Sequence, residues 1–179
     1  IVSAADHALA LIVDILDARR IAMGTAEMVF TDVDLAAELA EISAMLGTQA
    51  SAAGLVLETA PQAKLPKVVA DRRRVRQVLL NVAGNAIKFT PAGGRVQLTG
   101  QYASDGAVEI LVSDTGCGMA VDASQTHLHL PVPNRSRGIG LPLSRTLAEA
   151  NGARLTIDSQ VGVGTTVRLV FPSSCVVPP

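Results

Sequence analysis

Two amides and an ammonium recur at helical spacing in the segment RQVLLNVAGNAIKF. Asn81, Asn85 and Lys88 are four and three residues apart, which places their side chains on one face of a helix. An amide oxygen is a hard ligand suited to Mg²⁺, and a lysine beside it can meet phosphate oxygens. This face is therefore suited to a metal-bound polyphosphate, although an exposed polar stripe on a helix would give the same pattern.

A carboxylate followed by two glycines stands in the segment DTGCGM. Asp114 ends an apolar, strand-like run, and Gly116 and Gly118 follow it at once. A fixed carboxylate beside bare backbone suits a flat ligand, and an ordinary tight turn has the same composition.

Two more glycine clusters follow. The segment GIGL, residues 138–141, precedes a predicted helix, whose first N–H groups and dipole favour an anion. Gly138 and Gly140 would let a phosphate approach the backbone closely. In GVGTT, residues 162–166, the hydroxyl of Thr165 could reach a ligand. Taken alone, each cluster is equally typical of a loop or a hairpin turn.

Helices and strands alternate irregularly along the chain. Apolar periodicity and capping residues predict helices over residues 2–19, 35–47, 71–89 and 141–150. Alternating patterns predict short strands over 55–58 and 67–70 and two hairpins, over 95–114 and 153–171. Hairpins among helices indicate an α+β fold, a two-layer sandwich in which helices cover one face of a mixed or antiparallel sheet. The first helix has an apolar seam that needs a partner helix.

Composition excludes several classes of partner. The 179 residues carry 16 acidic and 15 basic side chains, so the chain has no large net positive charge that would attract it to nucleic acid or to an anionic membrane. The Arg72–Arg74 run has no interleaved aromatics for base stacking, and no apolar stretch is long enough to span a membrane. We expect Cys117 and Cys175 to be free thiols, which is typical of a reducing compartment.

The order of the motifs is more specific than any one of them. Asn-x-x-x-Asn-x-x-Lys lies on a helix, Asp-x-Gly-x-Gly follows a strand, Gly-x-Gly-Leu precedes a helix, and Gly-Thr lies in a terminal hairpin. In this order they resemble the N, G1, G2 and G3 boxes of sensor histidine kinases, whose ATP-binding domain has the Bergerat fold. The resemblance covers roughly residues 30–172 and implies a catalytic domain over residues 29–175. The segment HALALIVDILDARRIAMG is similar to the second helix of the family's dimerisation and phosphotransfer domain, which assigns residues 1–28 to that domain.

The resemblance also implies roles for residues. It makes Asn85 the Mg²⁺ ligand with Asn81 in support, places Lys88 on phosphate, and makes Asp114 the acceptor of the adenine amino group. The other residues that it assigns to ATP are Phe89, Gly116, Gly118, Met119, Gly138, Ile139, Gly140, Leu141 and Thr165. No residue of this chain is assigned a covalent catalytic role.

The resemblance implies that the γ-phosphate of ATP passes to a histidine outside this chain and then to a response regulator or phosphotransfer protein. His7 lacks the His-acid-x-x-x-Pro context of an acceptor. We expect a homodimer through the leading helix when the full two-helix domain is present. We also expect a cytoplasmic location, with a membrane-anchored receptor as one option for the whole protein, and no contact of this segment with membrane or nucleic acid.

One family motif has no match. Residues 119–137 contain no aromatic side chain, so the phenylalanine-containing F box between G1 and G2 is absent. A nucleotide-binding regulatory pseudokinase therefore stays open as an alternative to an active kinase. A stand-alone ATPase or anti-sigma-type protein kinase is disfavoured, because these relatives lack the leading helix.

Overall fold

The computed structural model describes residues 27–61, 64–119 and 140–178. The helix predicted over residues 2–19 lies outside the described residues, and so do Gly138 and Ile139. The assignment of residues 1–28 to a separate helical domain therefore stays a prediction.

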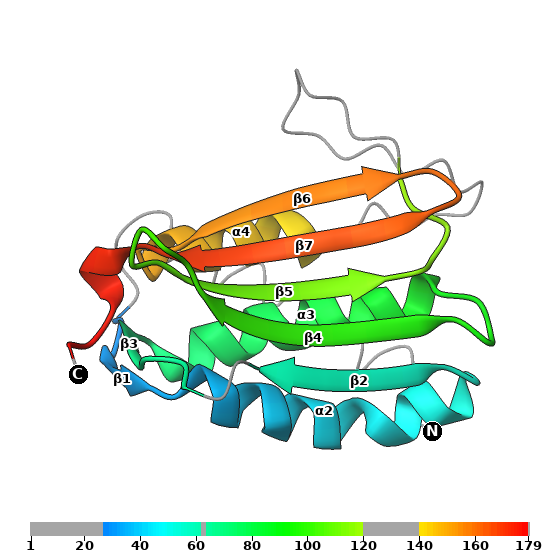
Figure 1. Ribbon diagram of the computed structural model, residues 1–179, viewed down its shortest axis with the longest axis horizontal. Coiled ribbons are helices and arrows are strands. Elements are labelled where there is room, and N and C mark those ends of the chain that lie inside the picture. Colours follow the sequence, from blue (N-terminus) through cyan, green and yellow to red (C-terminus); the bar gives the residue numbers. More distant parts are fainter. Residues whose placement is uncertain (1–26, 62–63, 120–139, 179) are drawn as a thin grey trace.

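A five-stranded sheet forms one layer of the fold, and helices form the other (Figure 1). The strands lie in the order β2 (Val56–Pro61), β4 (Arg95–Tyr102), β5 (Val108–Asp114), β7 (Gly164–Phe171) and β6 (Arg154–Gln160). β2 is parallel to β4, whereas β4–β5, β5–β7 and β6–β7 are antiparallel pairs. The predicted mixed sheet and both predicted hairpins are confirmed.

The helical layer consists of α2 (Leu35–Ala52), α3 (Arg72–Phe89) and α4 (Gly140–Ala150). Asp34 caps α2, and its Oδ1 accepts a hydrogen bond from the N–H of Ala37 at 3.0 Å. The sequence predicts that α2 ends at Gly47 or shortly after, and the helix ends five residues later, at Ala52. The helix continues because Leu46 and Ala50 are buried in the core, and this packing outweighs the low helix propensity of one glycine.

A smaller antiparallel pair joins β1 (Thr31–Val33) to β3 (Val68–Ala70) beside the helices. The sequence predicts β3 from its consecutive valines but not β1, whose three residues TDV include an aspartate, a residue depleted in strands. A short 3₁₀ turn, η1 (Ser173–Cys175), follows β7, and the next residue, Val176, forms an antiparallel bridge with Val68 of β3.

The core between the layers is almost entirely aliphatic. Phe171 is fully buried, and its aliphatic neighbours in the same cluster include Leu39, Ile42, Ile110 and Leu147. Among the described residues, no helix is long and apolar enough to cross a membrane.

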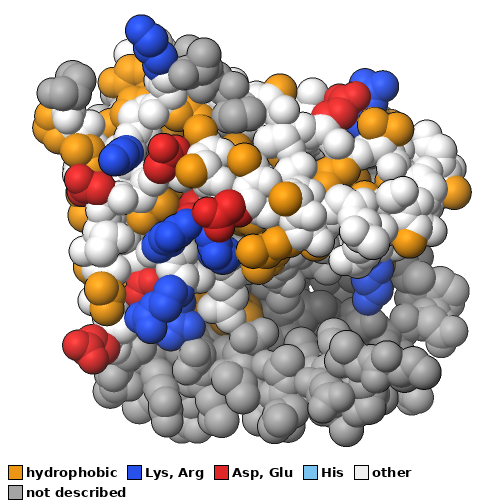
Figure 2. All heavy atoms as spheres, turned by 90° about the horizontal axis from the view of Figure 1, so that it is seen from below, with side chains coloured by type: hydrophobic (Ala, Val, Ile, Leu, Met, Phe, Trp, Pro, Cys, Tyr) orange, Lys and Arg blue, Asp and Glu red, His pale blue; other side chains and the backbone are white. Residues whose placement is uncertain are grey.

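Charged side chains on α2 and α3 pair with each other. Glu38 is 1% exposed and accepts hydrogen bonds from Arg72 and Arg76, both of which also pair with Glu41. On the face seen in Figure 2, basic and acidic side chains lie next to one another. The arginines at the start of α3 therefore serve partly to join two helices.

Asp71 is the buried cap of α3. Its Oδ1 accepts from the N–H groups of Arg73 and Arg74, and its Oδ2 accepts from the N–H of Val29 at 3.1 Å. Its own N–H donates to Oδ1 of Asn151 at 2.7 Å. Burial by itself raises the pKa of Asp71, but the hydrogen bonds from Val29, Arg73 and Arg74 outweigh it, so the pKa lies below its ordinary value.

We expect Asp71→Ala to lower the free energy of unfolding at pH 7 by about 3 kcal/mol, because it removes a cap and leaves three partly buried N–H donors unpaired. Asp34→Ala is the matched control. It removes an exposed cap with one hydrogen bond and should cost about 1 kcal/mol. Urea unfolding measures both, and equal losses would contradict the assigned role of Asp71.

The pH dependence of this difference follows from the lowered pKa. An acid with a lowered folded pKa stabilises the fold above its unfolded pKa and loses that contribution as pH falls through the folded value. The difference in the free energy of unfolding between the parent and Asp71→Ala should therefore be largest near neutral pH and decrease below pH 3.8.

Candidate functional site

Side chains from α3, β5, α4 and β7 enclose a small cavity. The residues that line it are Val82, Asn85, Ala86, Phe89, Val112, Asp114, Cys117, Gly118, Met119, Leu141, Thr165 and Val167. Most are apolar, and Asp114 is the one carboxylate among them. The cavity volume is about 30 Å³, which is the space of about one water molecule.

Asp114 ends β5 and is held by backbone. Its Oδ1 accepts from the N–H of Gly116 at 2.8 Å and from the N–H of Thr165 at 3.3 Å. Both of its hydrogen bonds with described residues end on Oδ1, which leaves Oδ2 for a further donor. Burial raises the pKa of Asp114 above its ordinary value, and the two N–H groups offset part of that effect.

The turn after Asp114 is fastened on two sides. The N–H of Cys117 donates to the carbonyl of Phe89 at 3.2 Å, and the N–H of Gly162 donates to the carbonyl of Cys117 at 2.8 Å. Gly118 has a φ of +62°, and a Cβ there would collide with the carbonyl of Gln160. The turn is therefore pressed against the β6–β7 hairpin, and only glycine fits this position without strain.

Ser159 on β6 joins the turn to Thr165. Its Oγ accepts from the N–H of Met119 at 2.8 Å and lies 2.8 Å from Oγ1 of Thr165. Thr165, predicted as a ligand-facing hydroxyl, is 8% exposed, so its hydroxyl is largely engaged inside the protein. Sequence reasoning missed Ser159, because a single serine in a strand carries no signal of its partner.

A chain of side-chain hydrogen bonds connects α4 with the polar face of α3. Nδ2 of Asn81 donates to Oγ of Ser144 at 2.7 Å, and Nδ2 of Asn85 approaches Oδ1 of Asn81 at 3.5 Å. Gly140 lies directly on the Asn81 amide, where a Cβ would be 2.5 Å from Oδ1. Asn81 is therefore fixed by α4. Ser144 is a second residue that the sequence did not reveal.

The third member of the predicted polar stripe is more open. Lys88 is exposed, and its Nζ lies 5.3 Å from the ring centroid of Phe89. The structure brings Asn85, Phe89, Asp114, Gly118 and Thr165 around one cavity. Two more predicted site residues, Met119 and Leu141, also line this cavity.

An oxygen ligand for a metal ion is available at this site. The Nδ2 atom of Asn85 faces Asn81, so its Oδ1 is the amide atom left for another partner. Among the described residues, no group of three His, Cys, Asp or Glu side chains could hold a metal ion. The donor set suits a hard ion bound by one amide oxygen together with oxygens from a ligand, as Mg²⁺ is bound with phosphates.

Comparison with known proteins finds a matching family model. Residues 70–174 match the model of histidine kinase-, DNA gyrase B- and HSP90-like ATPases. Cell-division control histidine kinase PdhS of Brucella suis is 36% identical over 183 residues, which cover 93% of this chain and 18% of that protein. The chain thus spans about a fifth of the length of this curated relative.

Solved structures give the same picture. Full-length ShkA, solved in complex with AMPPNP, aligns with a TM-score of 0.79 and 32% identity, covering 97% of this chain and 37% of that chain. The histidine kinase AdeS of Acinetobacter baumannii aligns with a TM-score of 0.74 and 19% identity, covering 91% of this chain and 77% of that one. The second likeness concerns the fold alone.

Proposed function

We propose that this chain, which belongs to the family of histidine kinase-, DNA gyrase B- and HSP90-like ATPases, is the ATP-binding catalytic part of a two-component sensor histidine kinase. The observation that carries the proposal is Asp114, a half-buried carboxylate at an apolar cavity with Oδ1 held by backbone and Oδ2 available. The likeness to PdhS and to ShkA with its bound AMPPNP supports this choice within the family.

The adenine base would lie against Asp114. A carboxylate oxygen accepts from the exocyclic amino group, and Gly118 lies in the cavity wall beside it. Gly116 would act by holding Oδ1 of Asp114 through its N–H. Met119, Phe89 and Thr165 would border the base. The cavity of about 30 Å³ is smaller than a purine, so the site would have to widen when the base enters.

The phosphates would extend along α3 toward the start of α4. Asn85 Oδ1 would hold Mg²⁺, which neutralises phosphate charge when it is bound, and Lys88 would contact phosphate oxygens. Asn81 would act by holding Asn85 in place. The N–H groups at the start of α4, with Gly138, Ile139 and Gly140, would receive phosphate oxygens.

The chain's part in phosphoryl transfer is positioning and charge stabilisation. The receiving histidine would come from a phosphotransfer domain, and residues 1–28 would supply one helix of that domain. Residues 29–175 would form the catalytic domain attached to it. The phosphate would then pass to a response regulator or phosphotransfer protein. We further propose a cytoplasmic location and, when the full two-helix domain is present, a homodimer formed through the leading helix.

Titration calorimetry with ATP, in the presence and absence of Mg²⁺, tests the nucleotide site. We expect Mg²⁺ to strengthen ATP binding by the parent chain, and Asn85→Ala to remove most of that gain because the amide oxygen is lost. Gln77→Ala, on the same helix but outside the cavity, is the control and should keep the Mg²⁺ effect. An unchanged Mg²⁺ effect in Asn85→Ala would contradict the assignment.

Kinase activity has a separate test. The chain is incubated with radiolabelled ATP and a two-helix phosphotransfer domain that carries an acceptor histidine. Acid-labile label on that histidine supports the kinase. Tight ATP binding without label on an intact acceptor would favour the pseudokinase, for which the missing F box is the motivation.

A further inference from the structure

The strand β6 forms one edge of the five-stranded sheet. Its seven residues pair with β7 on one side, and β6 is the last strand in the order of the sheet. Alternate N–H and C=O groups of an edge strand point away from its neighbour, which makes the edge a template for another strand. The edge is visible at the top of the sheet in Figure 1.

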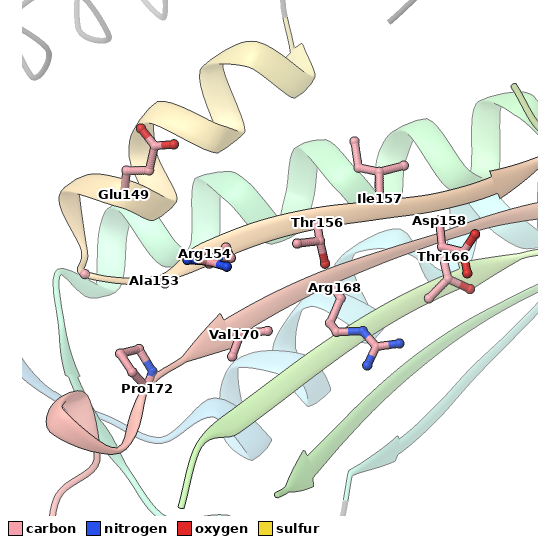
Figure 3. Close-up of a pocket in the computed structure, with 11 residues that line it drawn as sticks. Glu149, Ala153, Arg154, Thr156, Ile157, Asp158, Thr166, Arg168, Val170 and Pro172 are labelled. Carbon is pink, nitrogen blue, oxygen red and sulfur yellow. The ribbon is translucent and has the colours of Figure 1, made fainter. Parts of the chain in front are cut away.

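Exposed side chains alternate along this edge. Arg154, Thr156 and Asp158 are exposed on one face, whereas Leu155 is buried and Ile157 is half-buried on the other. In Figure 3, Ile157 points to the opposite side of β6 from Thr156 and Asp158. Neither Arg154 nor Asp158 has an ion-pair partner among the described residues, so both charges face solvent.

A cavity of about 790 Å³ runs beside β6 and β7 (Figure 3). Arg154, Thr156 and Asp158 line it, and Glu149 and Pro172 also border it. None of the residues assigned to ATP lies in its wall. The cavity lies over the face of β6 and β7 that carries these side chains, so this part of the sheet is a surface separate from the nucleotide site.

The sequence of β6 is complementary to itself in the antiparallel sense. With a two-fold axis at Thr156, Arg154 of one copy lies opposite Asp158 of the other, and this happens twice. Leu155 lies opposite Ile157, and Thr156 lies opposite Thr156. Opposite charges, apolar pairs and Thr–Thr pairs are the cross-strand combinations that stabilise antiparallel strands.

We propose that β6 is a self-association edge, on which a second copy of this chain adds its own β6 in antiparallel orientation to continue the sheet across a two-fold axis. Such an interface is isologous, as most closed homodimer interfaces are. The alternative parallel pairing in register would set Arg154 against Arg154 and Asp158 against Asp158. Like charges placed opposite each other are destabilising, so the charge order selects the antiparallel form.

The contact is small. Five central residue pairs bury less surface than the 1,200–2,000 Å² or so of a stable protein interface, so the association is weak and reversible. It operates where copies are already concentrated, for example when other parts of the protein hold them together. It involves no residue of the nucleotide site and is independent of the proposed function.

Sedimentation velocity of the full chain without nucleotide, over a series of protein concentrations, tests the proposal. We expect concentration-dependent association of the parent. Arg154→Asp alone and Asp158→Arg alone should each weaken self-association about ten-fold or more, because two attractive pairs become two repulsive ones. Lys67→Asp makes the same charge change at an exposed position away from β6 and should associate like the parent.

The decisive measurement is an equal mixture of the two single variants. In a mixed pair, one copy carries aspartate at both positions of β6 and the other copy carries arginine at both. Each cross-strand pair then joins opposite charges again, so association should return to about the parent level. Restoration also shows that both variants are folded. A parent that stays monomeric, single variants that associate like the parent, or a mixture that fails to associate would each overturn the proposal.

Discussion

Replacement of Asp114 by asparagine is expected to weaken ATP binding by about ten- to a hundred-fold, which corresponds to the roughly 1.5–3 kcal/mol of a hydrogen bond to a charged group. The carboxylate has two acceptor oxygens, and Oδ1 is occupied by the N–H groups of Gly116 and Thr165. An asparagine that keeps Oδ1 in this place turns an amide NH₂ toward the cavity. That group cannot accept from the amino group of adenine.

The same substitution should leave the fold intact, which separates a binding effect from unfolding. Asparagine retains the acceptor for both N–H groups and removes a partly buried charge. A carboxyl with a raised folded pKa loses stability as pH rises from its unfolded value of 3.8 through the folded value. The stability of Asp114→Asn relative to the parent should therefore increase over that range and then level off near neutral pH.

Titration calorimetry gives the affinity, and urea unfolding at pH 3 and pH 7 gives the stability. A variant that binds ATP like the parent would contradict the adenine assignment of Asp114. A variant that loses both binding and stability at pH 7 would contradict the geometry proposed for its two oxygens.

Substitution of Gly118 by alanine is expected to cost about 3 kcal/mol or more of folding free energy and to abolish measurable ATP binding. The residue has a left-handed φ of +62°, and the added Cβ meets backbone atoms of Gln160 and Val161 rather than a flexible side chain. The collision separates the turn after Asp114 from the β6–β7 hairpin, so both the hydrogen bond from the N–H of Met119 and the wall of the cavity are disturbed.

Gly93→Ala is the matched control. Gly93 also has a positive φ, +83°, but a Cβ there meets nothing within 4 Å. Its alanine variant carries the backbone strain without the collision and should cost about 1 kcal/mol. Thermal or urea unfolding compares the two, and equal losses would mean that the close approach at Gly118 is unimportant.

The sequence predicts the elements because their signals are local. Asp34 and Asp71 stand where helices begin, and the alternation of apolar residues marks both hairpins. The helical spacing of Asn81 and Asn85 likewise places both amides on one face. These features depend on neighbours within a few residues along the chain, so they can be read without knowledge of tertiary contacts.

What the sequence does not reveal depends on elements that meet only after folding. The partner of Asn81 is Ser144, 63 residues later, and that of Met119 is Ser159, 40 residues later. A lone serine has no pattern that names its partner. The continuation of α2 past Gly47 has the same origin, because the burial of Ala50 against other elements decides it.

The buried hydrogen bond from the N–H of Asp71 to Asn151 fixes the C-terminal end of α4 to the start of α3. Oδ1 of Asn151 is held at the start of α3, and its Nδ2 donates to the carbonyl of Leu147, so the last turn of α4 is anchored from two sides. The second turn is held on α3 through the Ser144 hydroxyl. Because α4 is tied to α3 at both places, a displacement of Leu141 that widens the cavity needs either a new side-chain rotamer of Leu141 or loss of the hydrogen bond between Asn81 and Ser144.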